Sequence, residues 1–375
     1  MEVQLDLQPF ELPGQSGAQN PFLIAGPCSA ESEQQVLETA SALKQEGIHL
    51  FRAGIWKPRT RPGGFQGLGS AALPWLRTVK DLTGLAVATE VANERHVYEA
   101  LKYDIDVLWI GARTTANPFA VEEIANALKG KDIPVMVKNP VNPDLKLWLG
   151  AIERLNMQGI KQLAAIHRGF SSYSKSSYRN PPQWNIPKQL KKIAPELPVF
   201  NDPSHITGNN ALLYEIAKDA MNKKFDGLMI EVHPNPPKAL SDSNQQITPA
   251  KFHELLYHLS LNNAQFTNLP EIEQLRKYID NLDEELLEII DKRMKLTGEI
   301  GSYKKQREIS VLQENRWKEL LETRIKNGQK KGLDQKFIKK IFETIHSESI
   351  TKQKTIKNND SKRVYSKFTT NNKLI

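Results

Sequence analysis

Six basic residues lie at or just beyond the ends of short apolar segments in the first half of the chain: Arg52, Lys57, Arg59, Arg113, Lys138 and Arg168. If these segments end at one rim, the six cations converge on one cavity and repel each other. Such a cavity is stable when it binds anions, so we expect phosphate or carboxylate ligands, two of them phosphorylated. Solvated surface cations would explain any one of the six, but they explain the whole set poorly.

Four other residues in similar positions offer donors for a metal ion: Cys28, His205, Glu231 and Asp242. One sulfur, one imidazole and two carboxylates suit a divalent transition metal (Mn, Fe, Co or Zn) that keeps positions open for substrate. Taken alone, Cys28 would more often be a small buried residue. Alternation along a strand places Glu231 and His233 on the same face, so periodicity leaves open which of them binds metal.

Lys138 also allows a different mechanism, in which its amine forms a Schiff base with a carbonyl substrate. Such a lysine needs a depressed pKa, which neighbouring cations could supply. We favour the metal-dependent interpretation over this alternative.

The elements that carry these residues follow one repeated pattern, in which a short β-branched apolar run precedes a helical stretch. Eight such runs recur about thirty residues apart: Phe22–Cys28, His49–Gly54, Ala86–Val91, Val107–Ala112, Pro134–Asn139, Leu163–Arg168, Pro198–Asp202 and Gly227–His233. This alternation predicts a parallel sheet, and eight units favour a closed (β/α)8 TIM barrel over residues 1–262. Catalytic groups of such barrels gather at the carboxyl ends of the strands. No Gly-x-Gly-x-x-Gly turn follows the first strand, which argues against a dinucleotide-binding fold.

After a linker at residues 263–270, the pattern changes to one long amphipathic helix that ends near Gln306. Its apolar residues recur at spacings of three and four: Ile272, Leu275, Ile279, Leu282, Leu286, Ile290 and Met294. Two further helices are predicted at 313–327 and 334–355, separated by Asn327-Gly328 and a restart at Gly332-Leu333-Asp334. A unit of this size makes a thin core by itself. We therefore predict an all-α domain over residues 271–355 that forms an intertwined homodimer or a higher homo-oligomer.

Three cations of the long helix support this dimer. Arg293 and Lys304 point within about 20° of each other, whereas Arg276 and Arg293 differ by about 100°. One helix therefore cannot aim all three at one ligand, but two copies can, with Arg276 entering the pocket of its partner. On the third helix, Ser349 and Gln353 share a face. A solvated coiled-coil surface is the ordinary alternative for such cations.

The net charge of +8 is concentrated at the C-terminus. Residues 352–375 carry a net +6, and the polar composition of 356–375 predicts a disordered basic tail. Basic charge of this kind is weak evidence for nucleic acid, so we expect no nucleic-acid partner. The single cysteine, the absence of long apolar runs and the N-terminal residues predict a cytoplasmic protein with no membrane partner.

The motifs of the barrel, taken together and in order, resemble those of one enzyme family. They are Gly26-Pro27-Cys28-Ser29, Lys57-Pro58-Arg59-Thr60, Ile110-Gly111-Ala112-Arg113, His167-Arg168-Gly169, Asp202-Pro203-Ser204-His205, Ile230-Glu231-Val232-His233 and Ser241-Asp242. Over about residues 20–262 the chain resembles the short type of 3-deoxy-D-arabino-heptulosonate 7-phosphate (DAHP) synthase. This type is related to the 3-deoxy-D-manno-octulosonate 8-phosphate synthases, which usually carry Ala-Asn where this chain has Pro58-Arg59.

The resemblance implies condensation of phosphoenolpyruvate with erythrose 4-phosphate, rather than with arabinose 5-phosphate. It implies that Cys28, His205, Glu231 and Asp242 bind the metal, which selects Glu231 over His233. It assigns phosphoenolpyruvate to Arg52, Lys57, Arg113, Lys138 and Arg168, of which Lys57, Lys138 and Arg168 are catalytic. Arg59 and Thr60 would bind the aldose phosphate.

A second set of motifs resembles the all-helical chorismate mutases over about residues 271–355. It comprises Leu275-Arg276, Ile279-Asp280, Leu282-Asp283, Arg293-Met294, Ile300-Gly301, Tyr303-Lys304, Arg316, Gly332-Leu333-Asp334, Ser349 and Gln353. The resemblance implies rearrangement of chorismate to prephenate, with Arg276 of the partner and Arg293 on the two carboxylates. Lys304 and Gln353 would bind the ether oxygen, and Arg316 and Ser349 would complete the pocket.

Two positions depart from this second pattern, because Gln313 and Trp317 stand where relatives often place acidic residues. A non-catalytic dimerisation and sensing role for the helical domain is therefore the alternative. In either case a fused mutase domain would bring chorismate or prephenate to the barrel. We hypothesise that one of the two inhibits the synthase allosterically.

Overall fold

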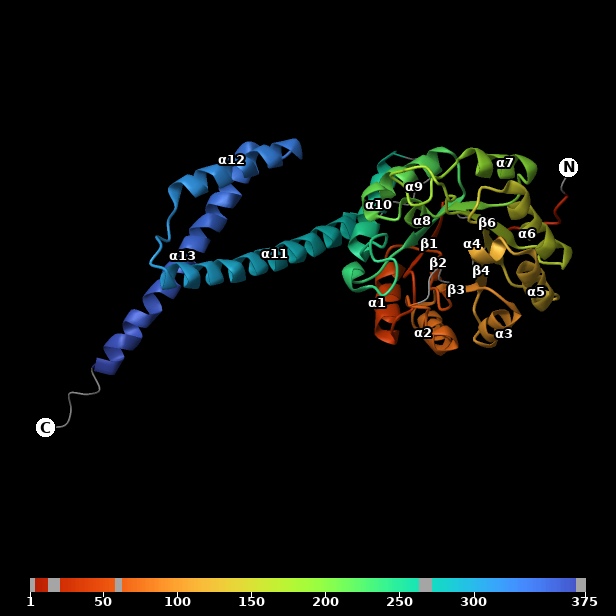
Figure 1. Cartoon of the computed structure of the whole chain (residues 1–375), viewed down its shortest axis with the longest axis horizontal. Coiled ribbons are helices and arrows are strands. Elements are labelled where there is room, and N and C mark those ends of the chain that lie inside the picture. Colours follow the sequence, from red (N-terminus) through yellow and green to blue (C-terminus); the bar gives the residue numbers. More distant parts are fainter. Residues whose placement is uncertain (1–3, 13–20, 58–62, 263–271, 369–375) are drawn as a thin grey trace. The chain divides into compact units, whose positions relative to one another are not determined.

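The computed structural model describes residues 4–12, 21–57, 63–262 and 272–368 of the 375-residue chain. For residues 261–262, 272–278, 281, 285 and 357–368 it describes the backbone alone. The chain divides into two compact units, Met1–Leu269 and Pro270–Ile375 (Figure 1). This division falls within the predicted linker, residues 263–270, which lie outside the described residues.

The first unit is a closed barrel of eight parallel strands, each paired with the next and β8 paired with β1. The strands are β1 Phe22–Gly26, β2 Leu50–Arg52, β3 Ala86–Val91, β4 Val107–Ile110, β5 Val135–Lys138, β6 Leu163–His167, β7 Val199–Asn201 and β8 Gly227–Glu231. The predicted (β/α)8 barrel is confirmed. Every predicted run contains one strand. Most of the strands end before the predicted C-terminal residue, because the last residues of the runs turn into the loops that form the rim.

The longer helices of this unit surround the strands on the outside of the barrel (Figure 1). The helices of the unit are α1 Glu33–Lys44, η1 Gly69–Ala72, α2 Leu73–Thr83, α3 Glu94–Lys102, α4 Ala112–Thr115, α5 Pro118–Leu128, α6 Leu145–Met157, α7 Asn185–Ile193, α8 Pro203–Thr207, η2 Asn210–Leu212, α9 Leu213–Asn222, η3 Pro236–Lys238 and α10 Pro249–Asn262. Local sequence sets their ends. Ser32 caps α1 by accepting a hydrogen bond from the Gln35 amide, and Gly84 ends α2 in the left-handed conformation.

Two apolar clusters form the core of the barrel unit, one between strands and helices and a smaller one inside the barrel. The inner cluster includes Phe22, Trp109 and Phe200. Phe10, from the segment before β1, packs edge-on against Phe22 and Phe200 with ring centroids 5.8 and 5.7 Å apart. Because Phe22 begins β1, this contact covers the amino-terminal end of the barrel and leaves the opposite rim for chemistry.

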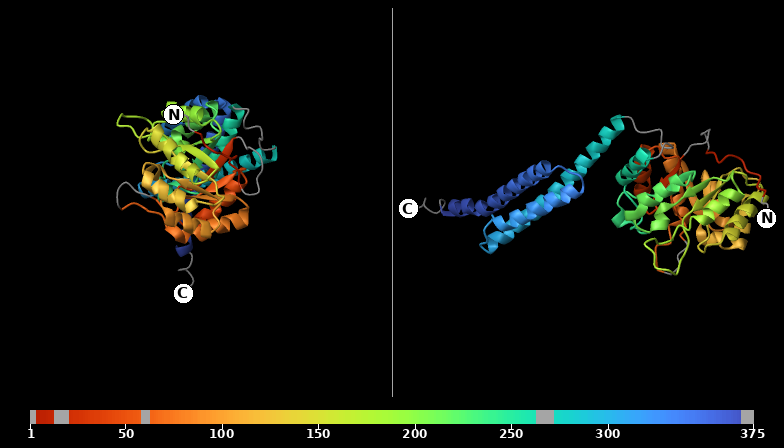
Figure 2. Two further views of the ribbon diagram at one scale, coloured as in Figure 1. Left: turned by 90° about the vertical axis from the view of Figure 1, so that its right-hand side faces the viewer. Right: turned by 90° about the horizontal axis from the view of Figure 1, so that it is seen from above.

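The second unit contains three helices, α11 Ile272–Gln306, α12 Glu314–Lys330 and α13 Gln335–Phe368. Helix α13 packs against both α11 and α12 (Figure 2). The predicted separator Asn327-Gly328 lies inside α12, which continues to Lys330. A Cβ at position 328 would stand 2.7 Å from the Ile338 side chain, so glycine here permits close packing of two helices and does not end one.

Helix α13 extends beyond the predicted end of the third helix. The sequence predicted a helix that ends at 355, but α13 continues to Phe368. The disorder predicted for the basic tail at 356–375 stays a prediction, and residues 369–375 lie outside the described residues. No proline or glycine occurs between residues 335 and 368 to stop the helix. The polar side chains at the end of α13 have little apolar surface to pack into a core, but the backbone can still form the hydrogen bonds of a helix. No described helix of either unit is both long and apolar enough to span a bilayer.

Candidate active sites

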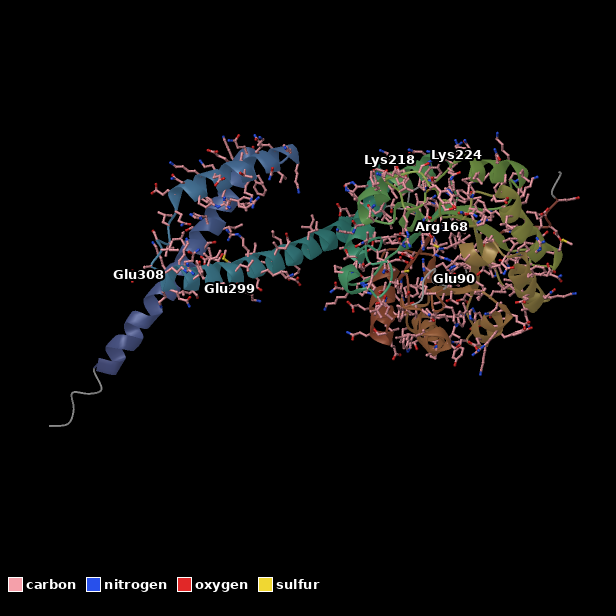
Figure 3. The ribbon with its side chains drawn as sticks, viewed as in Figure 1. Glu90, Arg168, Lys218, Lys224, Glu299 and Glu308 are labelled. Atoms are coloured by element: carbon pink, nitrogen blue, oxygen red, sulfur yellow. The ribbon has the colours of Figure 1, made fainter. Side chains whose placement is uncertain are left out.

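The first candidate site lies at the carboxyl rim of the barrel. Arg52, Lys138 and Glu231 end β2, β5 and β8, and Cys28 follows β1 by two residues. In a closed parallel barrel all of these ends face the same rim. Figure 3 shows Arg168 and Glu90 among the strands, whereas Lys218 and Lys224 lie at the periphery of the unit. The rim therefore gathers charged groups that are removed from solvent.

Internal carboxylates partly balance the buried cations. Arg52 donates to Glu231 Oε1 at 3.0 Å, and Lys138 Nζ lies 2.9 Å from Asp202 Oδ2. Both cations lie over the ring of Trp109, at 4.9 and 5.9 Å from its centroid. From the sequence we expected ligand anions to balance the charge. The structure shows that Glu231 and Asp202 supply part of the compensation.

Arg168 follows β6 and is buried beside other cations. Burial, together with Arg179 and Arg113, lowers its pKa to about 10 against the opposing effect of Asp202. The Arg168 amide donates to Asn139 Oδ1 at 2.7 Å, which fixes the backbone at the rim. Arg113, at the start of α4, is exposed and within electrostatic reach of Arg168. An anion bound here would offset the repulsion between these groups.

Lys57 connects the cations to the candidate metal ligands. Its ammonium donates to Cys28 Sγ at 3.1 Å. Burial alone would lower the pKa of Lys57, but Cys28 and Glu231 outweigh burial and raise it. The following residues Arg59 and Thr60, predicted to bind the aldose phosphate, lie outside the described residues.

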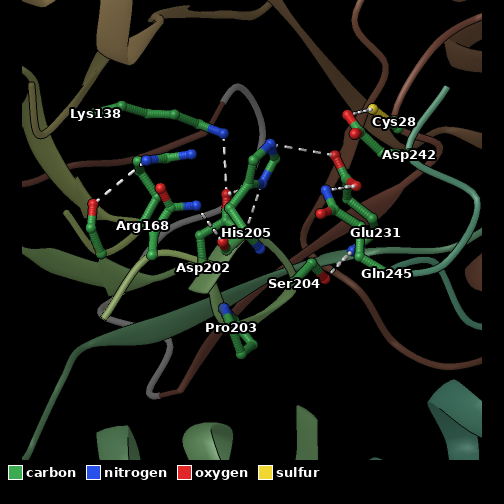
Figure 4. Close-up of polar contacts among 12 residues, drawn as sticks. Cys28, Lys138, Arg168, Asp202, Pro203, Ser204, His205, Glu231, Asp242 and Gln245 are labelled. Atoms are coloured by element: carbon green, nitrogen blue, oxygen red, sulfur yellow. Dashed lines mark hydrogen bonds and ion pairs between the residues drawn. The ribbon is translucent and has the colours of Figure 1, made fainter. Parts of the chain in front are cut away.

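The four predicted metal ligands lie together at the rim but contact each other in pairs (Figure 4). Cys28 Sγ is 3.4 Å from Asp242 Oδ2, and His205 Nε2 is 3.8 Å from Glu231 Oε1. His205 Nδ1 lies 2.8 Å from Asp202 Oδ2, which leaves Nε2 to face Glu231. A carboxylate behind the second imidazole nitrogen is the usual support of a histidine metal ligand.

Protonation states at this cluster fit a cation-binding role. Burial, followed by Glu231, raises the pKa of the Cys28 thiol to about 12, so the thiol keeps its proton until a cation displaces it. Burial lowers the pKa of His205 and keeps the imidazole neutral. Burial alone would raise the pKa of Asp242, but Arg179 and His205 outweigh it and hold it far below its usual range. In the described part of the chain, no three or more His, Cys, Asp or Glu side chains are already arranged to hold a metal ion.

Four residues of this site were not among the predicted site residues: Asp202, Gln245, Glu90 and Arg179. Asp202 could have been found, because it stands in the Asp202-Pro203-Ser204-His205 motif. Glu90 is the penultimate residue of β3 and accepts a hydrogen bond from Trp109 Nε1 at 3.1 Å. Arg179 and Gln245 lie on irregular loops, where neither periodicity nor spacing marks them.

The second candidate site lies between α11 and α13. Arg293 donates to Ser349 Oγ at 2.6 Å, and Lys304 Nζ donates to the Val311 carbonyl at 2.8 Å. Burial lowers the pKa of Lys304. Gln353 is buried, and its Oε1 has no hydrogen-bond partner in the structure. Four predicted residues therefore come from two packed helices, with one polar atom available for a ligand.

Other predicted residues of this site are not brought to it within one chain. Arg316 is exposed and donates to Glu319 at 3.0 Å. The side chain of Arg276 is outside the described residues. Trp317 stacks on His346 with centroids 3.8 Å apart, and burial, followed by Arg293 and Lys304, lowers the pKa of His346. His346 was not predicted, although it lies one turn before Ser349 on the same helix.

Helix α11 also exposes large apolar side chains along much of its length. Those more than 40% exposed are Ile279, Leu282, Leu286, Leu287, Ile289, Leu296, Ile300 and Tyr303. Removing this apolar surface from water would stabilise an assembly of two or more copies of the chain.

Comparison with protein families assigns both units. Residues 7–265 match the model of the DAHP synthetase I family. The chain belongs to this family. Residues 275–354 match the model of chorismate mutase type II, so the second family resemblance is confirmed as well. Members of the DAHP synthetase family are generally metal-dependent.

Two curated relatives cover the barrel. Phospho-2-dehydro-3-deoxyheptonate aldolase of Thermotoga maritima is 32% identical over 237 residues, which span 63% of this chain and 68% of that protein. The 2-dehydro-3-deoxyphosphooctonate aldolase of Legionella pneumophila is 29% identical over 263 residues, 64% of this chain and 90% of that protein. The crystal structure of the Thermotoga maritima DAHP synthase matches with a TM-score of 0.58 and 31% identity, covering 64% of this chain and 68% of that one. The chain is thus an enzyme with a DAHP synthase domain and a chorismate mutase domain.

Proposed function

We propose that the barrel, with a divalent metal ion, condenses phosphoenolpyruvate with erythrose 4-phosphate and water to DAHP and inorganic phosphate. The observation that carries this proposal is the burial of Arg52, Lys138 and Arg168 at one rim, with the half-buried Lys57, next to the cluster of Cys28, His205, Glu231 and Asp242. Cations packed this closely suit a small substrate with several negative charges.

Cys28, His205, Glu231 and Asp242 would hold the metal, since they offer the mixed donors that Mn, Fe, Co and Zn accept. When bound, the metal polarises the aldehyde oxygen of the aldose. Asp202 keeps the His205 ring oriented through Nδ1. Lys57 is placed to neutralise the Cys28 thiolate that forms when the cation displaces its proton.

The cations act by positioning and by electrostatic stabilisation. Arg168, Lys138 and Arg52, with Arg113 at the rim, would bind the phosphate and carboxylate of phosphoenolpyruvate. They would hold its enol carbon towards the aldehyde, so that the carbon–carbon bond forms within an oriented complex. Water would then add to the cationic carbon that carries the phosphate ester, and inorganic phosphate would leave. Because Trp109 supports Arg52 and Lys138 from below, these cations are ordered before substrate arrives.

We favour erythrose 4-phosphate as the aldose because Lys57-Pro58-Arg59-Thr60 follows the heptulosonate pattern. Relatives named for both the heptulosonate and the octulosonate product match the barrel, so the choice needs a direct test. Condensation rates with erythrose 4-phosphate and arabinose 5-phosphate should differ strongly in favour of the four-carbon sugar. Equal rates, or a preference for arabinose 5-phosphate, would contradict the assignment.

The Schiff-base alternative at Lys138 has less support. Lys138 is buried, and its Nζ lies 2.9 Å from Asp202 Oδ2, so an ion pair already engages the nitrogen that would have to attack a carbonyl. Treatment with a chelator should abolish condensation, and borohydride with substrate should trap no adduct on Lys138. A trapped adduct and an activity that survives chelation would favour the alternative.

For the helical unit we propose rearrangement of chorismate to prephenate. Arg293 would bind one carboxylate, and Lys304 and Gln353 would donate to the ether oxygen, where negative charge builds as its bond breaks. The reaction needs no proton transfer, so ordered charges suffice. Ser349 holds Arg293 in place. Arg276 of a second copy would bind the other carboxylate, and Arg316 would complete the pocket.

The same proposal includes a homodimer through the helical unit. Its support is the exposed apolar surface of α11, which a second copy would cover. A non-catalytic role in dimerisation and sensing is the alternative, since Gln313 and Trp317 replace acidic residues. An assay with chorismate alone distinguishes the two, because only a catalytic domain produces prephenate.

We also propose that prephenate or chorismate bound at the helical unit inhibits the barrel. Arg293→Ala should remove this inhibition in the full chain while the uninhibited condensation rate stays normal. Arg307→Ala, on the turn after α11, is the matched control and should leave inhibition intact. If the Arg293 variant remains as sensitive to prephenate and chorismate as the unaltered protein, the effector site lies elsewhere.

A further inference from the structure

We infer that Arg179, in the loop between β6 and α7, is a positioning residue for two ligands of the metal proposed above. The inference rests on the proposed metal-dependent function and concerns how the site is held. Arg179 donates through one nitrogen to Asp242 Oδ1 and to Gln245 Oε1, both at 2.9 Å. It therefore contacts one proposed ligand directly.

Gln245 extends the contact to a second ligand. While its Oε1 accepts from Arg179, its Nε2 donates to Glu231 Oε2 at 2.7 Å. Gln245 is almost fully buried, so its amide has little freedom to turn away. A shift of Arg179 should therefore disturb Asp242 and, through Gln245, Glu231.

The backbone around Arg179 is itself fixed to the segment that carries His205. The amides of Arg179 and Asn180 donate to the carbonyls of Thr207 and Ile206 at 3.3 and 3.0 Å. Asn180 Nδ2 donates to the His205 carbonyl at 2.7 Å. At Gly208, a Cβ would stand 2.5 Å from the Arg179 Cβ, so the loop packs closely on α8 and its end. The loop can thus hold a side chain at a defined position.

Asp242 is the ligand that most needs such support. Its φ of +47° lies in the left-handed region, which is unfavourable for a residue with a side chain. It occurs outside the helices and strands, in the segment between η3 and α10. Arg179 contacts one of its oxygens, while the other lies 3.4 Å from Cys28 Sγ. Arg179 thereby leaves Oδ2 directed at the thiol side of the cluster.

The charge of Arg179 and its positioning role predict opposite changes in metal affinity when the side chain is removed. Its positive charge would oppose a nearby metal cation, so its removal would tighten metal binding if charge dominated. The side chain is 49% exposed, however, and solvent screens its charge. Loss of an outer hydrogen-bonding partner of metal ligands typically weakens metal affinity by about 10–100-fold. We therefore expect positioning to dominate.

The test is a Co²⁺ titration of the metal-free full-length protein, followed by the absorption of the cobalt–thiolate bond. Arg179→Ala should raise the dissociation constant for Co²⁺ by about 10–100-fold. Arg179→Lys should fall between the two proteins, because an ammonium keeps the charge but lacks the planar geometry of the guanidinium. Lys175→Ala, which removes an exposed charge from the same loop, is the control and should bind as the unaltered protein does.

The outcomes separate the inference from the proposed function. Unaltered protein that shows no cobalt–thiolate absorption contradicts the metal site itself. Unaltered protein that binds Co²⁺, with Arg179→Ala binding equally well or more tightly, overturns the positioning role. Thermal melts of the metal-free proteins show whether the alanine variant is folded. If it is not, the lysine variant decides, and an unchanged dissociation constant for that variant overturns the role.

Discussion

The two units of this chain build their sites in opposite ways. At the barrel rim, buried cations are paired within the same chain, Arg52 with Glu231 and Lys138 with Asp202. In the helical unit, Arg293 is held by Ser349, but Arg316 contacts only its helical neighbour Glu319 among the described interactions, and apolar residues of α11 face solvent. The barrel pairs these charges within one chain, whereas the proposed helical site takes Arg276 from a second copy. The difference teaches that a site can be pre-organised by internal counter-charges or by assembly.

The largest effect should come from breaking an internal pair of the barrel. Lys138→Met should lower the condensation rate by about 10²–10³-fold, as loss of a group that stabilises developing charge does. It should also destabilise the unit by about 3–5 kcal/mol, because Asp202 is left buried and unpaired. Adding Asp202→Asn should restore stability without restoring the rate. Steady-state kinetics and denaturant unfolding measure the two effects, and an unchanged rate in the single variant would argue against internal pairing as part of the site.

The counterpart in the helical unit is a charge placed on its exposed apolar surface. Leu286→Glu should weaken dimerisation by about 10²-fold, as truncating a central interface residue does, and should lower mutase activity at dilute protein. The condensation rate should stay normal if the barrel site is complete in one chain. Light scattering and both assays provide the measurement. Lys318→Glu, on exposed α12, is the control, and a Leu286 variant that stays dimeric and active would place the interface elsewhere.

A smaller effect should follow from loosening one side chain of the helical site. Ser349→Ala removes the partner of Arg293, a hydrogen bond to a charged group that contributes about 1.5–3 kcal/mol. The kcat/KM for chorismate should therefore fall by roughly 10–100-fold. Ser347→Ala, on an exposed position of the same helix, should leave it unchanged. Equal kcat/KM values for both variants would mean that Arg293 does not depend on Ser349.

The smallest predicted effect is an acid sensitivity of the barrel unit. Burial lowers the pKa of His167 to about 4, so the folded protein keeps it neutral where the unfolded chain protonates it. Protonation of His167 in the unfolded chain therefore costs the folded protein nothing above pH 6.5 and destabilises it increasingly as pH falls towards 4. At pH 5 the stability lost in this way is about 2 kcal/mol. Denaturant unfolding at pH 7 and 5 should show that His167→Gln loses less stability than the unaltered protein. Identical losses would exclude His167 as the cause.

Regular elements with strong periodicity were predictable from the sequence. The eight apolar runs specified the barrel, and spacings of three and four specified α11. Helix ends were less predictable, since Gly328 lies inside α12 for a packing reason that only the position of Ile338 reveals. Likewise, α13 continues past residue 355 because nothing in its sequence stops it.

The residues of the candidate site were likewise predictable where they lie on regular elements and not where they lie on irregular loops. Residues at strand ends, such as Arg52, Lys138 and Glu231, were predictable because the fold carries them to one rim. Arg179 and Gln245 were not, because irregular loops place them and only their contacts show their relation to Asp242. His346 was missed for a similar reason: its position is fixed by stacking on Trp317, which lies on another helix.

The central claim is that a divalent metal held by Cys28 acts beside the converging cations of the barrel. Its most direct test is the metal content and condensation rate of Cys28→Ala, with mutase activity measured in the same preparation. We predict loss of bound metal, condensation reduced to background, and an unchanged rate with chorismate. A Cys28→Ala protein that keeps its metal and condenses at the full rate would contradict the account.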